Sequence, residues 1–276
     1  MPYCGAVEHT ASRTAYAVAL RRAVHQQRDR PLVLDDPLAL RIVDAADLDR
    51  VAGTALRAFV VARSRFAEDV LAEAVRDGVR QYVVLGAGLD TFACRNPYGD
   101  LRVFEVDHPL TQRRKRERLR AAGIGVPATA TFAPIDFERE ALADALSRAG
   151  FHAGEPAAFS WLGVTPYLTR AAAQDTIAFV GRLPARTRLV FDYAPDPSTL
   201  SGDVRVAFDA LARRVAAAGE PFQTFFDPDE LAQGLRRAGF SAIEDLGPEA
   251  INARYFAGRA DGLRVAGAGR LLRAEV

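Results

Sequence analysis

Glycine and acidic residues follow successive apolar segments of the chain, at a spacing that could build a binding site. The segment QYVVL, residues 81–85, leads directly into Gly86-Ala87-Gly88. Glycines after a buried strand let the backbone turn tightly and approach a ligand closely. The next segment, LRVFEVD, ends in Asp107, nineteen residues after Gly88. A carboxylate at that point can accept hydrogen bonds from both hydroxyl groups of a ribose.

A third segment, TATFAPID, ends in Asp136 and is followed by Phe137. A carboxylate there can accept a hydrogen bond from the amino group of adenine, and the apolar neighbour can line the ring. The three segment ends together predict a site for an adenosine-containing cofactor. Asp107 would repel a 2′-phosphate, which argues against NADP, and Thr91 stands where the dinucleotide fingerprint has its third glycine. Each feature alone has a structural explanation: a tight turn for the glycines and a helix N-cap for Asp136.

Strand-like and helix-like segments alternate from residue 81 onward, which predicts a doubly wound sheet. Strands are expected over residues 81–85, 101–107, 129–136, 157–162, 188–193, 240–246 and 253–257. Helices are expected over residues 110–122, 138–148, 170–182 and from Pro228 to Gly239, with Asp227 as N-cap. The fold class is therefore α/β, with a Rossmann-like, mostly parallel, seven-stranded sheet whose strand ends bring the acidic residues together.

The first 80 residues contain helical patterns and no strand signal. Helices are expected over residues 10–27, 37–46 and 54–76, the second with Asp36 as N-cap, and Gly78 is placed to end the third. We therefore expect residues 1–80 to form a helical cap or lid, and residues 81–276 to form the cofactor-binding core as one compact unit. The chain shows no repeat and no low-complexity linker.

Composition excludes disordered, collagen-like and disulfide-scaffold proteins. The chain has 276 residues, with 49% hydrophobic and 26% charged residues and a formal net charge of +1. These values are ordinary for a globular protein and give no electrostatic pull toward nucleic acid or a membrane. Two cysteines and four histidines without metal-ligand spacing predict no metal site. No signal peptide or membrane-spanning run is visible, so a cytoplasmic location is expected.

Taken in order, the motifs resemble the class I S-adenosylmethionine-dependent methyltransferases. More narrowly, the chain resembles the bacterial O-methyltransferase branch of the leucine carboxyl methyltransferase family. The core motifs are VVLGAGLDTFACR (83–95), FEVDHP (104–109), APIDFE (133–138), FSWLGVTPYLT (159–169) and VFDYA (190–194). The cap motifs are TASRTAYAVALRRA (10–23), DDPLA (35–39) and ARSRF (62–66). The resemblance covers most of the chain and implies S-adenosyl-L-methionine as the cofactor.

The resemblance also implies a role for each matched residue. The glycines pass beside the methionine part of the cofactor, Asp107 holds the ribose and Asp136 the adenine amine. Arg63 aligns best with the family arginine that pairs with the cofactor carboxylate, and Arg65 is the alternative. The expected cofactor-binding residues are Arg63, Gly86, Gly88, Asp90, Asp107, His108, Asp136, Phe137, Trp161 and Leu162. Leu162 stands where many members have a glutamate, and Trp161 has core filling as its alternative role.

The methyl acceptor is less clearly encoded. A carboxylate acceptor is ionised at neutral pH and needs no general base, whereas a hydroxyl acceptor usually needs one. The sequence offers no clear base, which favours a carboxylate of a small molecule or peptide over a hydroxyl. Tyr167, Tyr255 and Arg259 are the candidates for orienting the acceptor. Specificity is expected to reside in the cap and in residues 195–226, and the sequence does not predict an oligomeric state.

Three other functions would share parts of this sequence pattern. An NAD-dependent oxidoreductase would share the glycine loop, but Thr91 and the absence of a Ser/Tyr/Lys catalytic set count against it. A non-catalytic homologue that keeps the cofactor site stays open because of Leu162. The basic run from Arg113 to Arg120 could suit nucleic acid, but a solvated helix face is favoured, with Leu110 and Leu119 facing inward.

Overall fold

The computed structural model describes residues 13–136 and 140–276. One predicted cofactor-binding residue, Phe137, lies outside the described residues. No helix in the described ranges is long and apolar enough to span a membrane.

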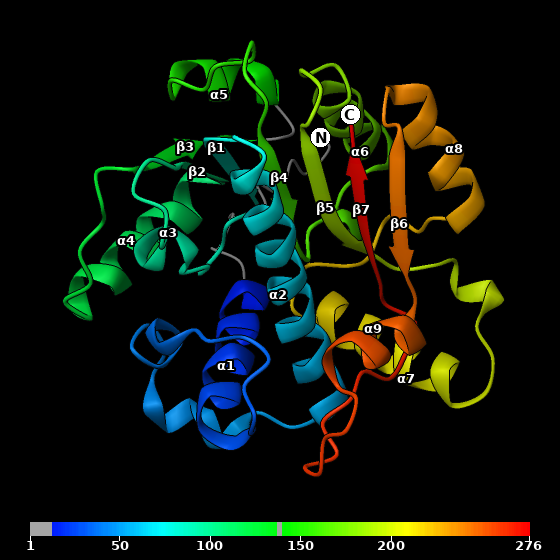
Figure 1. Ribbon diagram of the computed structural model, residues 1–276. Coiled ribbons are helices and arrows are strands. Elements are labelled where there is room, and N and C mark those ends of the chain that lie inside the picture. Colours follow the sequence, from blue (N-terminus) through cyan, green and yellow to red (C-terminus); the bar gives the residue numbers. More distant parts are fainter. Residues whose placement is uncertain (1–12, 137–139) are drawn as a thin grey trace, which may run out of the picture.

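The core is a seven-stranded sheet in the order β3-β2-β1-β4-β5-β7-β6. Its strands are β1 Gln81–Leu85, β2 Arg102–Asp107, β3 Ala130–Pro134, β4 Ala158–Trp161, β5 Arg188–Tyr193, β6 Ala242–Leu246 and β7 Arg270–Glu275. The first five are mutually parallel, and β7 is antiparallel to both β5 and β6. Figure 1 shows β7 running upward between β5 and β6. The prediction of a doubly wound, mostly parallel, seven-stranded sheet is confirmed.

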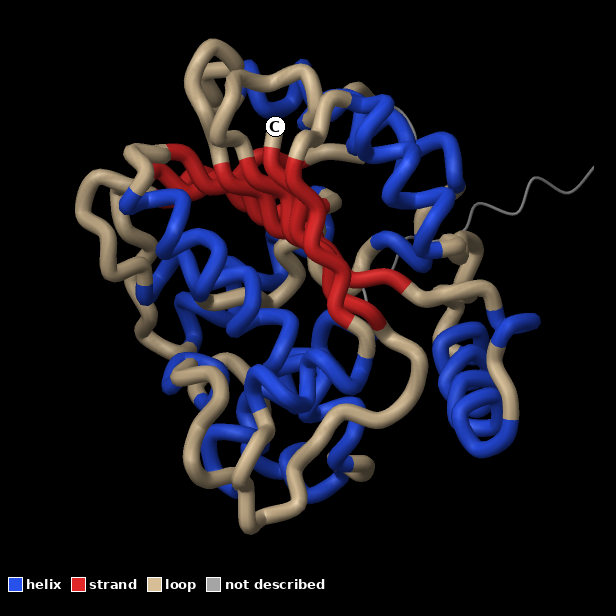
Figure 2. The backbone as a smooth tube through the Cα atoms, turned by 45° about the vertical axis from the view of Figure 1, so that its right-hand side comes forward, coloured by secondary structure: helices blue, strands red, loops and turns tan. Residues whose placement is uncertain are grey.

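Helices cover both faces of the sheet, which Figure 2 shows almost edge-on. The α-helices are α1 Arg13–Arg28, α2 Thr54–Arg76, α3 Phe92–Arg95, α4 Pro109–Ala121, α5 Leu142–Arg148, α6 Arg170–Val180, α7 Gly202–Ala217, α8 Pro228–Ala238 and α9 Pro248–Tyr255. The short 3-10 helices are η1 Pro37–Leu40, η2 Ala45–Arg50, η3 Thr165–Tyr167 and η4 Pro197–Thr199. Asp227 caps α8 by accepting from two backbone N–H groups, as predicted.

Strand register brings the predicted site residues to one edge. Leu85, the last residue of β1, lies beside Val106 of β2 and beside Trp161 of β4. Asp107 lies beside Pro134 of β3. Because parallel strands share their carboxyl ends, the loops that follow β1, β2, β3 and β4 open at this same edge, where open α/β sheets bind ligands.

The described helices of the N-terminal segment, called the cap above, pack on this edge and on the sheet. Helix α1 packs against α2 and η1, and its buried face meets Leu89 of the glycine loop and Leu119 of α4. Helix α2 packs directly on β4, β5 and β7. The division of the chain at residue 80 into cap and core stays a prediction.

The structure corrects several predicted elements. Residues 253–257 were expected to be a strand, but residues 253–255 end α9 and residues 256 and 257 form a turn, with Ile251 and Phe256 packed against α2. The last strand is instead β7, whose Leu271 and Leu272 are fully buried. The helix expected over residues 37–46 is replaced by η1 and η2, although Asp36 caps η1 as predicted. Helix α5 begins at Leu142, and residues 140 and 141 of the helix expected over residues 138–148 are not helical, while residues 138 and 139 lie outside the described residues. Helix α7 was not predicted, since little of it is buried.

Buried His25 ties α1 to the connector that follows it. Its Nδ1 lies 2.8 Å from Oδ2 of Asp29, and its Nε2 accepts from the backbone N–H groups of Val33 and Leu34. Accepting at Nε2 requires the neutral ring, with the proton on Nδ1. Burial lowers the pKa of His25 below its ordinary 6.5, although Asp29 opposes this effect.

We therefore predict that the protein loses stability as the pH falls below about 6.5. The unfolded chain binds a proton at His25 that the folded chain excludes, so the free energy of unfolding rises with pH, by up to about 1.4 kcal/mol per pH unit for one group. Urea unfolding between pH 5 and pH 7.5 measures this slope. The change His25→Gln should flatten it, whereas His152→Gln, at an exposed position, should not. Equal slopes in all three proteins would contradict the prediction.

Candidate functional site

The glycine loop after β1 has the backbone that its sequence predicts. Gly86 and Gly88 have φ angles of +64° and +48°, which residues with a side chain rarely adopt. A Cβ on Gly86 would lie 2.3 Å from Cγ2 of Val164, in the loop after β4. A Cβ on Gly88 would lie 3.2 Å from Cβ of Ala15 on α1. The glycines therefore allow the loop to pass closely between the β4 loop and the cap.

Asp107 holds the glycine loop from the neighbouring strand. Its Oδ2 accepts from the N–H of Gly88 at 2.6 Å, and its Oδ1 accepts from the N–H of His108 at 2.7 Å. Burial raises the pKa of the Asp107 carboxyl, and these two N–H groups oppose that effect. A carboxylate has about four acceptor positions, so this pair of bonds leaves capacity for two hydroxyl groups.

Asp136 lies next along the same edge. The N–H of Ile135 donates to the carbonyl of Asp107 at 3.0 Å, which extends the pairing of β3 with β2 to the residue before Asp136. His108, predicted near the cofactor, is the N-cap of α4 and accepts from the N–H of Leu110. The structure therefore brings together Gly86, Gly88, Asp107, His108 and Asp136.

Arg63 reaches the same edge from α2. Its guanidinium is buried and donates to Oδ2 of Asp192 on β5 at 3.0 Å. It also lies against Gly163, where an added Cβ would be 2.7 Å from either terminal nitrogen. The N–H of Gly163 donates to Oδ1 of Asp192, so one carboxylate fixes both the arginine and the β4 loop. Arg65, the alternative to Arg63, pairs instead with Asp69 at an exposed position.

The structure also places Trp161 and Leu162, which belong to the motif FSWLGVTPYLT at the end of β4. Trp161 is 1% exposed and packs with Phe191 in the core, which agrees with the core-filling role left open by the sequence. Leu162 packs with the apolar face of α2. The acidic group at this part of the edge is Asp192, which sequence reasoning missed. Its position in the VFDYA motif, one residue before the end of β5, was the available signal. Roles for Trp161 and Leu162 at the cofactor stay predictions.

The three predicted acceptor-orienting residues do not share one location. Tyr167, in the loop after β4, lies near Arg63, and burial raises the pKa of its hydroxyl to about 12. Tyr255 donates to Asp69 on α2. Arg259 pairs with Asp261 and donates to the carbonyl of Pro31 in the cap connector. Tyr255 and Arg259 thus join the C-terminal segment to the cap, and their role toward an acceptor stays a prediction.

A buried polar network, also missed from the sequence, fastens the cap to the glycine loop. Asp36 is completely buried, pairs with Arg22 of α1 at 3.0 Å and accepts from the hydroxyl of Thr91 at 2.5 Å. Arg22 also donates to the carbonyl of Leu89. Asp90 lies 3.5 Å from Arg22. Burial tends to raise the pKa of the Asp90 carboxyl, but nearby cations, with Arg22 the strongest, lower it overall.

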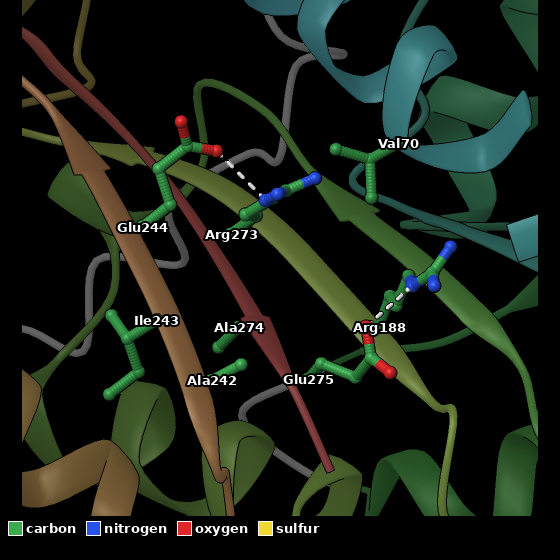
Figure 3. A pocket seen from close by; sticks show the side chains of 8 residues that line it. All are labelled: Val70, Arg188, Ala242, Ile243, Glu244, Arg273, Ala274 and Glu275. Atoms are coloured by element: carbon green, nitrogen blue, oxygen red, sulfur yellow. Dashed lines mark hydrogen bonds and ion pairs between the residues drawn. The ribbon is translucent and has the colours of Figure 1, made fainter. Parts of the chain in front are cut away.

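The pocket drawn in Figure 3 is a different feature. It has a volume of about 110 Å³ and lies at the antiparallel end of the sheet, where ion pairs join Arg273 to Glu244 and Arg188 to Glu275. Its lining includes no residue of the glycine loop and neither Asp107 nor Asp136. In residues 13–136 and 140–276, no three His, Cys, Asp or Glu side chains are grouped to hold a metal ion.

Comparison with known proteins agrees with this geometry. Residues 15–181 match the model of the leucine carboxyl methyltransferase family. The chain belongs to this family. A Bacillus subtilis relative, provisionally named S-adenosyl-L-methionine-dependent methyltransferase YktD, is 31% identical over 93% of this chain and 95% of its own length. A Mycolicibacterium paratuberculosis relative of the same provisional name is 30% identical over 90% of this chain and 88% of its own.

A solved structure from Thermobifida fusca, provisionally named a methyltransferase, shares the fold. Its TM-score is 0.59 at 17% identity, over 94% of this chain and 93% of its own. Family membership confirms the prediction of an S-adenosylmethionine-dependent methyltransferase. The donor set fits that cofactor, because it combines a glycine backbone, a partly buried carboxylate with spare acceptor positions and a buried arginine.

We predict that Gly86→Ala weakens binding of S-adenosylhomocysteine to the methyltransferase about tenfold. The added methyl group would clash with Val164, and the alanine would have to adopt an unfavourable φ angle. Together these two effects cost about 1–3 kcal/mol. Calorimetric titration measures the change. Adding Val164→Ala should recover part of the loss, because it removes the contact but not the backbone strain. The matched control is Gly99→Ala, where a Cβ meets no atom within 4 Å. Wild-type affinity in Gly86→Ala would contradict the prediction.

Proposed function

We propose that this methyltransferase acts on oxygen, at a carboxylate or hydroxyl group of a small molecule or peptide. The observation that carries the proposal is the placement of Gly86, Asp107 and Arg63 at one edge of the sheet, directly beneath the cap. The family match through residues 15–181 supports it. Such an enzyme needs to align the acceptor with the methyl group and to exclude water, and the packed cap suits both tasks.

We assign the cofactor contacts as follows. Asp107 would accept from the ribose hydroxyls, and Asp136 from the adenine amine. Arg63 would bind the methionine carboxylate, since a guanidinium can form two parallel hydrogen bonds with a carboxylate. When bound, S-adenosylmethionine supplies a methyl group already activated by its sulfonium. Asp192 keeps the Arg63 guanidinium oriented toward the β4 loop.

The nature of the acceptor depends on the groups near Tyr167. With a pKa of about 12, its hydroxyl is protonated at neutral pH, so it donates a hydrogen bond instead of removing a proton. A carboxylate acceptor needs no base and fits this arrangement. The charge of Glu220 also raises the pKa of Tyr167, and one of its carboxylate oxygens is buried without a hydrogen bond to any described residue. For a hydroxyl acceptor, Glu220 is the candidate base.

We propose that the protein binds neither nucleic acid nor membranes. Lys115, in the middle of the basic run on α4, is buried and pairs with Glu105 of β2 at 2.6 Å. The basic run is therefore interrupted, although Arg113, Arg114, Arg116 and Arg120 are exposed. This arrangement favours a solvated helix face over a continuous basic surface. The cytoplasmic location stays a prediction.

The test is transfer of a labelled methyl group from S-adenosylmethionine to a panel of acids, phenols and alcohols. A methyl ester releases labelled methanol in mild alkali, whereas a methyl ether does not. We expect alkali-labile product from an acid in the panel. Alkali-stable product from a phenol or alcohol would identify a hydroxyl acceptor and point to Glu220. Labelling of nitrogen only would contradict the proposal.

A further inference from the structure

Asp192 is held at the carboxyl end of β5 by residues from two other parts of the fold. Its side chain is 6% exposed, and its Oδ2 lies 3.0 Å from Nη1 of Arg63 on α2. Its Oδ1 accepts from the N–H of Gly163, and its main-chain carbonyl accepts from the hydroxyl of Thr165 at 2.6 Å. The carboxylate therefore has a fixed position between α2 and the loop after β4.

This ion pair lies next to the glycine loop. A Cβ on Gly86 would be 2.3 Å from Cγ2 of Val164, so the glycine loop and the β4 loop are in close contact. A Cβ on Gly163, the residue before Val164, would be 2.7 Å from both terminal nitrogens of Arg63. Two consecutive residues of the β4 loop thus contact the glycine loop and the Arg63–Asp192 pair.

The charges of the pair match those of the cofactor's methionine part. That part carries a carboxylate and an ammonium group on the same carbon atom at neutral pH. With the carboxylate bound to Arg63, as proposed above, the ammonium lies close to the guanidinium, and two neighbouring cations repel each other. Asp192 supplies the opposite charge beside Arg63. Opposite charges then alternate around a set of four groups, and each charge is balanced by its neighbours.

Asp192 also has room to accept further hydrogen bonds. A carboxylate has about four acceptor positions, and Arg63 and Gly163 occupy one each. The adjacent Leu162 has no polar side-chain atom and packs with the apolar face of α2. An ammonium group that loses its water on binding needs an acceptor in the protein, and Asp192 can provide one.

We propose that Asp192 accepts a hydrogen bond from the ammonium group of the cofactor. The Arg63–Asp192 pair then recognises both charges of the methionine part and makes the site selective for a ligand that carries both. This inference rests on the proposed function, because it takes Arg63 to bind the carboxylate. It gives Asp192 a direct contact with the cofactor in addition to its role in orienting Arg63.

The test is calorimetric titration with two ligands that differ only in the ammonium group. S-adenosylhomocysteine carries this group, whereas the adenosyl thioether of 4-mercaptobutyrate keeps the carboxylate and lacks the ammonium. We expect the wild-type protein to bind S-adenosylhomocysteine about 10- to 100-fold more tightly than the thioether acid. Asp192→Asn keeps the size of the side chain but removes its charge, so it should reduce this ratio to about threefold or less.

The matched control is Asp245→Asn. Asp245, on β6, is also a partly buried acid that pairs with an arginine, Arg270, at 3.0 Å. Because it is not assigned to the cofactor, its variant should keep the wild-type ratio of affinities. A ratio that fell equally in the two variants would overturn the inference.

The ratio also separates direct contact from positioning. If Asp192 acts only by orienting Arg63, Asp192→Asn weakens both ligands equally and the ratio keeps its wild-type value, which would overturn the inference. Urea unfolding shows whether the variant is folded. The double variant Arg63→Gln with Asp192→Asn removes both members of the buried pair and so leaves no uncompensated charge. It should show the same small ratio, and a wild-type ratio in it would contradict the inference as well.

The wild-type protein distinguishes this inference from the proposed function. Equal binding of the two ligands by the wild-type protein would overturn the role of Asp192 and leave the proposed function standing. If the wild-type protein binds neither ligand, the proposed function itself fails.

Discussion

Replacing Asp107 with alanine is expected to weaken binding of S-adenosylhomocysteine by about 100-fold or more. Two charge-assisted hydrogen bonds to the ribose would be lost, each worth about 1.5–3 kcal/mol. The N–H groups of Gly88 and His108 would lose their acceptor as well, so the glycine loop would no longer be held on β2. Calorimetric titration of wild type and variant measures the effect directly.

Two further variants test whether the loss of affinity is specific to the Asp107 carboxylate. Asp107→Asn keeps the size of the side chain and one acceptor oxygen, so its loss should be smaller than that of alanine. Asp100→Ala removes an exposed carboxylate that pairs with Arg80 and should leave affinity unchanged. Urea unfolding checks that each variant is folded. Wild-type affinity in a folded Asp107→Ala would show that the ribose is bound elsewhere.

The second large effect is expected from Asp36→Ala. Asp36 is 0% exposed, pairs with Arg22, accepts from Thr91 and caps η1. Removing one member of a buried ion pair leaves a buried charge uncompensated, at a cost of about 3–5 kcal/mol. We expect a loss of this size in the free energy of unfolding. Because Thr91 follows the glycine loop directly, affinity for S-adenosylhomocysteine should fall too.

The matched control for Asp36 is Asp49→Ala. Asp49 also pairs with a cap arginine, Arg28, but its side chain is 92% exposed. Surface ion pairs contribute about 0–1 kcal/mol, so this variant should unfold almost as the wild type does. If both variants lost the same stability, the buried network would not be what fastens the cap.

Local patterns were sufficient for most individual elements. Helix α2 has the bounds that its apolar spacing predicts, and β1 and β5 match the continuous apolar runs. Both signals are strong because burial on one helix face, or on both faces of a strand, leaves a regular pattern. The end of the chain was misassigned, since Tyr255 and Phe256 suit either a strand or an apolar helix face. Only the packing against α2 decides between these.

The sequence by itself determined which residues gather at the edge where we propose that the cofactor binds. The glycine turn follows β1, Asp107 ends β2 and Asp136 comes two residues after β3, so the parallel register alone brings them together. The partners of Asp36 and Asp192 were decided only by the tertiary structure. Arg63 meets Asp192 across 129 residues, and Thr91 meets Asp36 across 55. Such pairs form because helices from the cap fold back over the sheet. Local spacing in the sequence does not predict which buried charged side chains will pair.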